Sequence, residues 1–173
     1  GCTNFVNFSI SQPSQIVGNV GVLNSTCNGS DNGSIFVQAS GGTGTIQYSL
    51  NGTAYGPTSS WTGLPAANYI VYVRDANNCT IGLLATVTEP LEIALNGNID
   101  HVNCAGGNDG SINLNVTGGI EPYAFAWSNG VTREDLFNLN SGTYAVIVTD
   151  ANGCTATDGY TVLEPAMPII ING

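Results

Sequence analysis

The chain repeats itself with a period of about 75 residues, and this periodicity constrains its fold more than any other feature. Cys2, Cys79 and Cys154 lie 77 and 75 residues apart, and a second pair, Cys27 and Cys104, lies 77 residues apart. A proline follows each cysteine of the first set after 11 residues. Two residue types therefore give the same period, which predicts a tandem array.

The period divides the chain into two complete units with a partial unit on either side. Residues 14–90 and 91–165 are predicted to be complete β-sandwich repeats. Residues 1–13 are predicted to be the terminal strand of a truncated preceding repeat, and residues 166–173 the start of a following repeat or a linker. Because the chain opens inside a pattern that recurs later, we expect it to be cut from a longer array.

Alternating apolar residues indicate strands in both units. In residues 142–155, Tyr144, Val146 and Val148 share one face, and an Asp-Ala-Asn-Gly turn and a cysteine follow. Residues 68–80 show the same order. Six or seven short strands per unit, separated by regularly spaced turns, predict an all-β fold of tandem immunoglobulin-like β-sandwich repeats of about 75 residues.

Composition excludes several classes of partner. The chain has 2 basic and 12 acidic residues, with a formal charge of -10, so nucleic acid and anionic membrane surfaces would repel it. With 42% hydrophobic residues and 23 glycines it is expected to be compact and rich in turns, with essentially no helix and no membrane insertion.

The cysteines are predicted to form disulfides, which place the chain outside the cytosol. If four up-and-down strands separate Cys104 from Cys154, both cysteines lie at the same end of one unit. That parity favours Cys27 with Cys79 and Cys104 with Cys154, and leaves Cys2 unpaired in this fragment. A hidden extra strand would break the parity and favour Cys79 with Cys104, so this alternative stays open.

With these residues in view, the pattern resembles the SprB repeat of bacterial gliding adhesins, which are very long surface proteins of Bacteroidetes. The first unit departs from it at Leu50, where the pattern has tryptophan, and at Asn78, where it has glycine. The resemblance implies export through the type IX secretion route and a filament moved along the cell surface during gliding. The matching stretches are CAGGNDGSINLNVTGG at 104–119, PYAFAWSNG at 122–130, LNSGTYAVIVTDANGCT at 139–155 and VLEP at 162–165.

Calcium is one candidate ligand, because hard oxygen donors recur once per period. The candidates are turn aspartates and the glutamates at the unit junctions. The competing interpretation is that Asp, Asn and Gly stand there because turns need them. No other cofactor is expected. The calcium candidates are Asp31, Asp75, Asp109, Asp150, Glu89 and Glu164.

Aromatic residues have two interpretations as well. Tyr48, Phe125 and Trp127 could form a sugar-binding platform, but alternating aromatics more often fill a sandwich core. Tyr69 and Tyr144 resemble the tyrosine corner of immunoglobulin-like sandwiches, which has a structural role.

An enzyme is not expected, because His101 is the single histidine and no nucleophile and base recur together in the two units. The sequence therefore favours a non-enzymatic segment of a secreted adhesin or extracellular fibre at the cell surface. Neighbouring repeats would be its partners, with an external surface or glycan as a further one. The alternative is a carbohydrate-binding or spacer module of a secreted multidomain enzyme.

Overall fold

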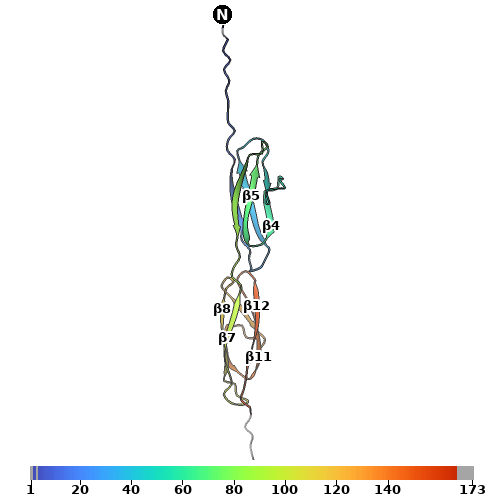
Figure 1. Cartoon of the computed structure of the whole chain (residues 1–173). Helices are drawn as coiled ribbons and strands as arrows, with labels where there is room; N and C mark the ends of the chain where they lie inside the picture. The colour runs from blue at the N-terminus through green and yellow to red at the C-terminus, as the bar shows by residue number, and fades with distance from the viewer. Residues whose placement is uncertain (1, 3, 167–173) are drawn as a thin grey trace, which may run out of the picture. The chain divides into compact units, whose positions relative to one another are not determined.

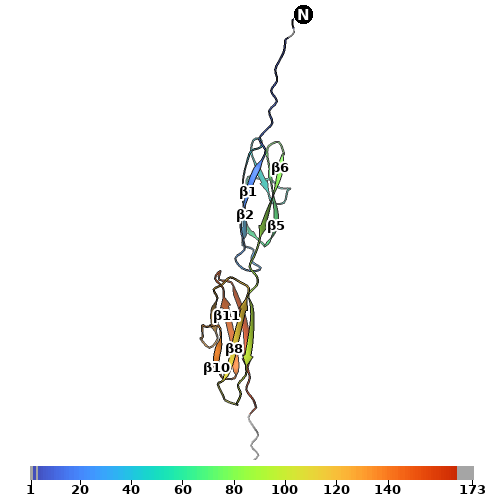
Figure 2. The same cartoon turned by 90° about the vertical axis from the view of Figure 1, so that its left-hand side faces the viewer.

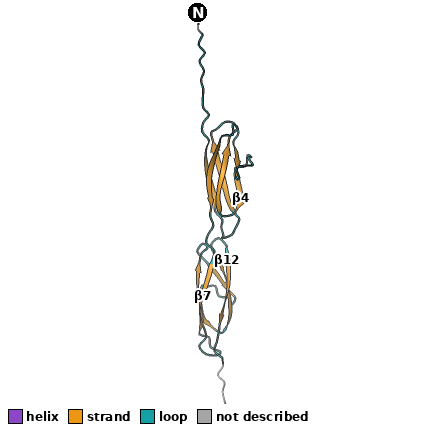
Figure 3. Ribbon diagram, in the orientation of Figure 1, coloured by secondary structure: helices purple, strands orange, loops and turns teal. Residues whose placement is uncertain are grey.

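The structure, a computed structural model, describes residue 2 and residues 4–166. These residues form two compact units, unit 1 with strands β1 to β6 and unit 2 with strands β7 to β12 (Figure 1). All of their regular structure is strand, joined by loops and turns (Figure 3). The described part of the chain contains no helix able to cross a membrane. The predicted all-β class is confirmed.

Each unit contains six strands. In unit 1 they are β1 (Val17–Leu23), β2 (Gly33–Ser40), β3 (Gln47–Ser49), β4 (Ser60–Leu64), β5 (Ala67–Arg74) and β6 (Thr80–Val87). In unit 2 they are β7 (Ala94–Asp100), β8 (Gly110–Thr117), β9 (Ala124–Trp127), β10 (Leu136–Leu139), β11 (Gly142–Thr149) and β12 (Thr155–Val162).

The strands of each unit form two three-stranded antiparallel sheets. In unit 2 the orders are β10-β8-β7 and β12-β11-β9, and in unit 1 they are β1-β2-β4 and β3-β5-β6. Figure 2, turned by 90° from Figure 1, labels β8 and β10 of one sheet of unit 2 and β11 of the other. The apolar faces of the two sheets meet in one core per unit, which confirms the immunoglobulin-like β-sandwich architecture.

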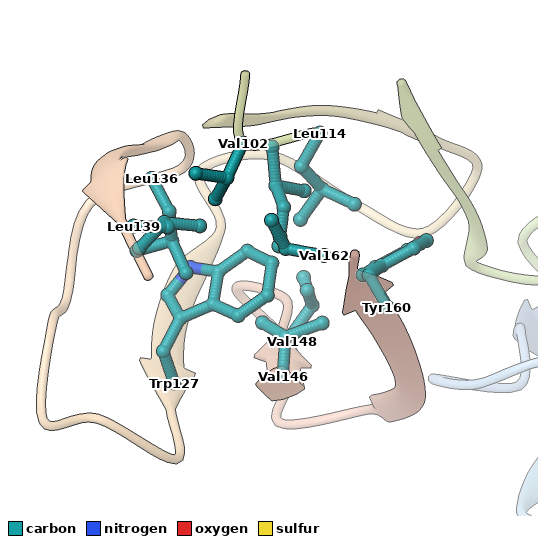
Figure 4. Close-up of a cluster of buried hydrophobic side chains, with 10 residues drawn as sticks. Val102, Leu114, Trp127, Leu136, Leu139, Val146, Val148, Tyr160 and Val162 are labelled. Carbon is teal, nitrogen blue, oxygen red and sulfur yellow. The ribbon is translucent and has the colours of Figure 1, made fainter. Parts of the chain in front are cut away.

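Alternation along the strands builds these cores. In β11, Val146 and Val148 are fully buried while Ile147 between them is half exposed, because successive side chains point to opposite faces of a strand. Trp127 on β9 is only 4% exposed. Figure 4 shows its indole among side chains from both sheets, with Tyr160 on the other side of the cluster.

The two shortest strands of unit 2 run in the same direction. In β9, Ala124 pairs with Thr149 and Trp127 with Val146, so the strand covers only half the length of β11. Residues 128–135 then cross to the other sheet, where β10 pairs with the first residues of β8. Together β9 and β10 make one traverse of the sandwich. β3 and β4 do the same in unit 1.

The chain enters and leaves each sandwich at opposite ends. β7 starts opposite the last residue of β8, and β12 finishes opposite the first residue of β11. We call the end where β8 and β11 finish the aspartate end, because Asp150 lies there. In unit 1, the strands β1, β2, β5 and β6 run in the same directions as β7, β8, β11 and β12 of unit 2. Asp75 marks the aspartate end of unit 1.

The structure differs from the predicted boundaries in several places. The division between units falls at Thr88 and Glu89, and Thr26–Asn28 groups with unit 2. Residues 4–13 form no strand, and none of the described strands pairs with them. The first strand of unit 2, β7, begins at Ala94, inside the predicted unit start at residue 91. Of the predicted final segment, residues 167–173 lie outside the described residues.

Candidate functional site at the aspartate and cysteine turns

Asp150 closes the turn that joins β11 to β12. Its Oδ1 accepts hydrogen bonds from the backbone N–H groups of Asn152 and Cys154, both at 2.9 Å. Its Oδ2 accepts the N–H of Ile120 at 3.0 Å, just beyond the end of β8. One carboxylate therefore shapes its own turn and ties it to the opposite sheet. We call residues 75–79 and 150–154 the aspartate turns.

Asp75 makes the equivalent contacts in unit 1. Its Oδ1 accepts the N–H groups of Asn77 and Cys79, and its Oδ2 that of Thr43, all at 2.9 Å. Burial alone would raise the pKa of this carboxyl group, but the N–H donors outweigh burial and lower its pKa, as they do for Asp150. Both carboxylates are thus ionised at neutral pH, and both of their oxygens are already engaged by the protein.

A pair of glycines allows this contact in each unit. Gly119 and Gly42 precede the residues that donate to the Oδ2 atoms, and their φ angles are 61° and 68°. A Cβ on Gly119 would lie 3.0 Å from Asp150 Oδ2, and one on Gly42 would lie 3.1 Å from Asp75 Oδ2. From the sequence, these glycines were not connected with the aspartates. Their recurrence at the same phase as the aspartates was the signal that could have linked the two.

Asp109 lies at the other end of unit 2, in the turn that carries Cys104. Its carboxylate accepts hydrogen bonds from the side-chain amide and the backbone N–H of Asn103, and these bonds lower its pKa. Eight-residue β8 separates it from Asp150, roughly 26 Å at about 3.3 Å per residue. Asp109 and Asp150 therefore lie at opposite ends of unit 2.

The two junction glutamates contact cysteine-bearing turns, residues 26–29 and 103–107, which we call the cysteine turns. Glu164 Oε2 accepts the backbone N–H of Gly106 at 2.7 Å. Glu89 Oε1 accepts the side-chain amide of Asn28 at 3.3 Å. Their recurrence thus coincides with a recurring structural contact.

These positions can be compared with the clustering of ligands that a calcium site needs. Within residues 2 and 4–166, no three His, Cys, Asp or Glu side chains gather as a metal site would need. Asp31 is exposed, and the repeat register places Asn32, not Asp31, at the position equivalent to Asp109. The turn interpretation accounts for the contacts of Asp75, Asp109, Asp150, Glu89 and Glu164.

The disulfide pairing differs from the predicted one. The structure joins Cys27 to Cys154, with Cα atoms 5.6 Å apart, and leaves Cys2, Cys79 and Cys104 as exposed free thiols. The predicted bonds Cys27–Cys79 and Cys104–Cys154 are therefore wrong, and so is the alternative Cys79–Cys104.

The reason is the single traverse made by β9 and β10. Counting them as two strands gave an even number between Cys104 and Cys154 and placed both cysteines at one end. Because they run in the same direction, the chain makes three passes, through β8, through β9 with β10, and through β11. Cys104 and Cys154 therefore lie at opposite ends of unit 2.

Trp127 is a core residue and not part of an exposed platform. It is 4% exposed, its indole Nε1–H donates to the carbonyl of Arg133 at 3.0 Å, and its ring lies 6.1 Å from that of Tyr160. Phe125 and Tyr48 are partly buried and pack against the cores of their units. The core interpretation of these aromatics is confirmed.

The tyrosine corners are also confirmed. Tyr69 and Tyr144 donate their hydroxyls to carbonyls four residues upstream, Pro65 at 2.9 Å and Asn140 at 3.0 Å. His101 Nδ1 accepts the N–H of Leu163 at 3.2 Å, so this histidine too has a structural contact.

Comparison with known families gives two matches. A family profile described as the SprB repeat matches residues 22–54 and 96–132. The first match covers the end of β1 through β3 and the second covers β7 through β9, so both begin in the first strand of a sandwich. No curated protein sequence matches the chain.

Comparison with solved structures finds sandwiches of low identity. The C-terminal 282-residue fragment of intimin, solved in complex with the intimin-binding domain of the translocated intimin receptor, is 17% identical, with a TM-score of 0.44 over 90% of this chain. The N-terminal four Ig domains of Dscam1 are 10% identical, with a TM-score of 0.39, also over 90% of this chain. The chain spans 64% of the intimin fragment and 47% of the Dscam1 fragment.

Proposed function

We propose that this protein is a non-enzymatic repeat segment of a long adhesin or fibre at the cell surface, on the basis of its two matches to the SprB repeat profile. One observation carries the proposal. The side chains that recur in the two units are held in equivalent structural contacts, at the aspartate turns and the tyrosine corners. What recurs in this chain is thus a scaffold, as expected of an array whose units act by number.

Gliding motility and export by the type IX route are the finer parts of the proposal. They rest on the resemblance to gliding adhesins and on the disulfide, which requires an oxidising compartment. The proposed partners that the same cell supplies are the neighbouring repeats of the chain, the type IX secretion machinery and the gliding machinery. An external surface would be the adhesive target.

Labelling of intact cells of the source bacterium tests this proposal. Antibodies raised against the 173-residue chain should bind unpermeabilised cells, and deletion of the repeats from the parent gene should reduce attachment to surfaces. Antibodies against a cytosolic protein provide the control. Labelling that requires permeabilisation, or unchanged attachment after deletion, would contradict the proposal.

A carbohydrate-binding function has one observation in its favour. Tyr48, Tyr55 and Trp61 line a surface pocket of about 340 Å³ in unit 1, together with polar Asn51 and Thr58. Aromatic side chains beside polar groups in one pocket suit sugar recognition.

A glycan array probed with the chain and with a Trp61→Ala variant tests this second candidate. Binding of one sugar class that the variant loses, while the variant keeps its fold by circular dichroism, would favour a carbohydrate-binding module. Absence of binding by the unmodified chain would exclude sugar recognition at this pocket for the glycans displayed.

A further inference from the structure

Four of the cysteines occupy two kinds of position. Cys27 and Cys104 lie in the cysteine turns, each two residues before a glycine of positive φ, 68° at Gly29 and 75° at Gly106. Cys79 and Cys154 end the aspartate turns. Each donates its backbone N–H to an aspartate Oδ1 at 2.9 Å.

The observed disulfide joins one position of each kind. It connects the cysteine turn at Cys27 to the aspartate turn at Cys154, across 127 residues of sequence. Unit 2 is thus completed by three residues, Thr26–Asn28, that precede it in the sequence. Asn152 Nδ2 also donates to the carbonyl of Thr26 at 2.9 Å, so the tripeptide is held by more than the sulfur bond.

Unit 1 has the same aspartate turn but no such tripeptide. Asp75 N–H donates to the carbonyl of Cys79 at 3.0 Å, and Asp150 N–H to that of Cys154 at 2.9 Å, so the two turns agree in backbone geometry. Cys79 is nevertheless free and exposed, and Cys104 in the second cysteine turn is free and exposed as well. Cys79 and Cys104 thus lie in the same two kinds of turn as the bonded cysteines Cys154 and Cys27, but both are free thiols.

We propose that each cysteine turn is joined by a disulfide to the aspartate turn of the repeat that follows it along the array. Cys104 would bond the aspartate-turn cysteine of the next repeat, and Cys79 the cysteine-turn cysteine of the preceding one. The inference rests on the proposed function in that it requires an array longer than the two units. Cys2, which shares the spacing of Cys79 and Cys154, would belong to the same series.

Bond formation follows thiol–disulfide exchange. The two cysteine thiols lose two protons and two electrons and form one S–S bond. A disulfide oxidant, such as oxidised glutathione, takes up the two protons and the two electrons and is released as two thiols. Every bond of this kind closes a long loop, so each repeat would be fastened both through its peptide linker and through a sulfur bridge.

An extended chain tests the pairing. A second copy of residues 91–165 is inserted between Pro165 and Ala166, with Cys104→Ser in the copy so that one free cysteine turn remains and Thr155→Ser to mark its peptides by mass. After refolding in glutathione buffer, non-reducing peptic mapping should show Cys104 bonded to the marked aspartate-turn peptide while Cys27–Cys154 is retained. Placing Cys154→Ser in the copy should return Cys104 to a free thiol.

A free Cys104 beside an intact Cys27–Cys154 bond, or a Cys104–Cys79 bond, would overturn the proposal. The intact Cys27–Cys154 bond also shows that the extended chain has folded. Disulfide mapping does not depend on export or adhesion, so its failure would leave the surface assignment untouched. Likewise, absence of surface labelling would leave the pairing rule untouched.

The unextended chain gives a second measurement. In a Cys2→Ser background, one variant carries Cys79→Ser and the other Cys104→Ser, and both are oxidised alone and as a mixture. Mixed dimers bonded through Cys79 and Cys104 should exceed the like-with-like dimers that each variant forms alone. Random pairing of an equimolar mixture already gives twice as much mixed dimer as either like-with-like dimer, so a mixed yield no higher than that would contradict a specific pairing of the two turns.

Discussion

The two units share a backbone plan but fill their cores differently. Both have the same strand directions, the same aspartate turn and the same tyrosine corner. Unit 2 places Trp127 on β9, where unit 1 has Leu50 after β3, while unit 1 places Trp61 on β4, where unit 2 has the fully buried Leu136. Backbone hydrogen bonds thus set the plan, and each core receives its tryptophan from a different strand.

A second exchange links the first and last strands of each unit. In unit 2 the ring of Tyr160 lies over Gly97, where an added Cβ would approach it to 2.5 Å. In unit 1 the equivalent residues are Val20 and Ala85, both in or against the core. The larger residue of the pair thus lies on β12 in unit 2 and on β1 in unit 1, which predicts that the two positions are coupled.

The largest expected difference between the units comes from truncating Trp127 in unit 2 and the equivalent residue, Leu50, in unit 1. Trp127→Ala should lower the free energy of unfolding of unit 2 by about 3–5 kcal/mol, because it empties the centre of the core. Leu50→Ala should cost unit 1 less, about 1–2 kcal/mol, because Leu50 is only partly buried. Hydrogen exchange measured by mass spectrometry resolves the two units. Equal losses would mean that the cores are not filled differently.

The exchange between Gly97 and Tyr160 can be tested by a double-mutant cycle. Gly97→Val should destabilise unit 2 by about 1–3 kcal/mol, because the valine meets the Tyr160 ring. Adding Tyr160→Ala should recover part of this loss, since the pair then matches Val20 and Ala85 of unit 1. Denaturant unfolding followed by Trp127 fluorescence in a Trp61→Phe background reports on unit 2. Additive effects would show that the positions are independent.

The tyrosine corners should be equivalent in the two units. Tyr69→Phe and Tyr144→Phe each remove one hydroxyl-to-carbonyl hydrogen bond and should cost about 1 kcal/mol in their own unit. Tyr72→Phe, outside both corners, serves as the control. Hydrogen exchange of each unit is the measurement. A loss confined to one unit would mean that the corner stabilises only one of the two cores.

The smallest expected effect is on stability in acid, and both units should show it. The pKa values of Asp75 and Asp150 are lowered in the folded state from the ordinary value of 3.8. Their stabilisation is therefore complete above that value and lost as the pH falls through the folded pKa. Asp75→Asn should weaken the acid dependence of unit 1 and leave that of unit 2.

Melting curves between pH 7 and about pH 2, followed by hydrogen exchange for each unit, provide the measurement, because carboxylates titrate in that range. Asp31→Asn, a change at an exposed aspartate outside the aspartate turns, is the control. An unchanged acid dependence of unit 1 in the Asp75→Asn variant would show that other groups control it.

Local patterns in the sequence were sufficient to predict the central strands and their turns. Tyr144, Val146 and Val148 alternate strictly, and the turn after them carries the Asp and Gly that its geometry needs. The tyrosine corners followed from spacing alone. These features depend on contacts a few residues apart, which a sequence displays directly.

Features that depend on distant contacts were missed. Strand β7 contains Asn96, Gly97 and Asn98, residues that strands usually avoid, because Tyr160 on β12 supplies the packing that Gly97 lacks. The direction of β10 is set by its pairing with β8, and nothing in Leu136–Leu139 itself reveals it. The parity argument depended on that direction. Because the sequence does not reveal the direction of β10, the predicted disulfide pairing was wrong.

The opposite placement of entry and exit in each sandwich has a mechanical consequence. A pull on the two ends of a unit draws β7 and β12 along their own axes and in opposite senses. The seven residue pairs between β7 and β8 and the eight between β11 and β12 are then loaded together in shear, instead of being opened one after another. A unit held only through its peptide linkers resists tension in this way, whereas a disulfide to the start of β12, such as Cys27–Cys154, transmits the pull along β12 itself.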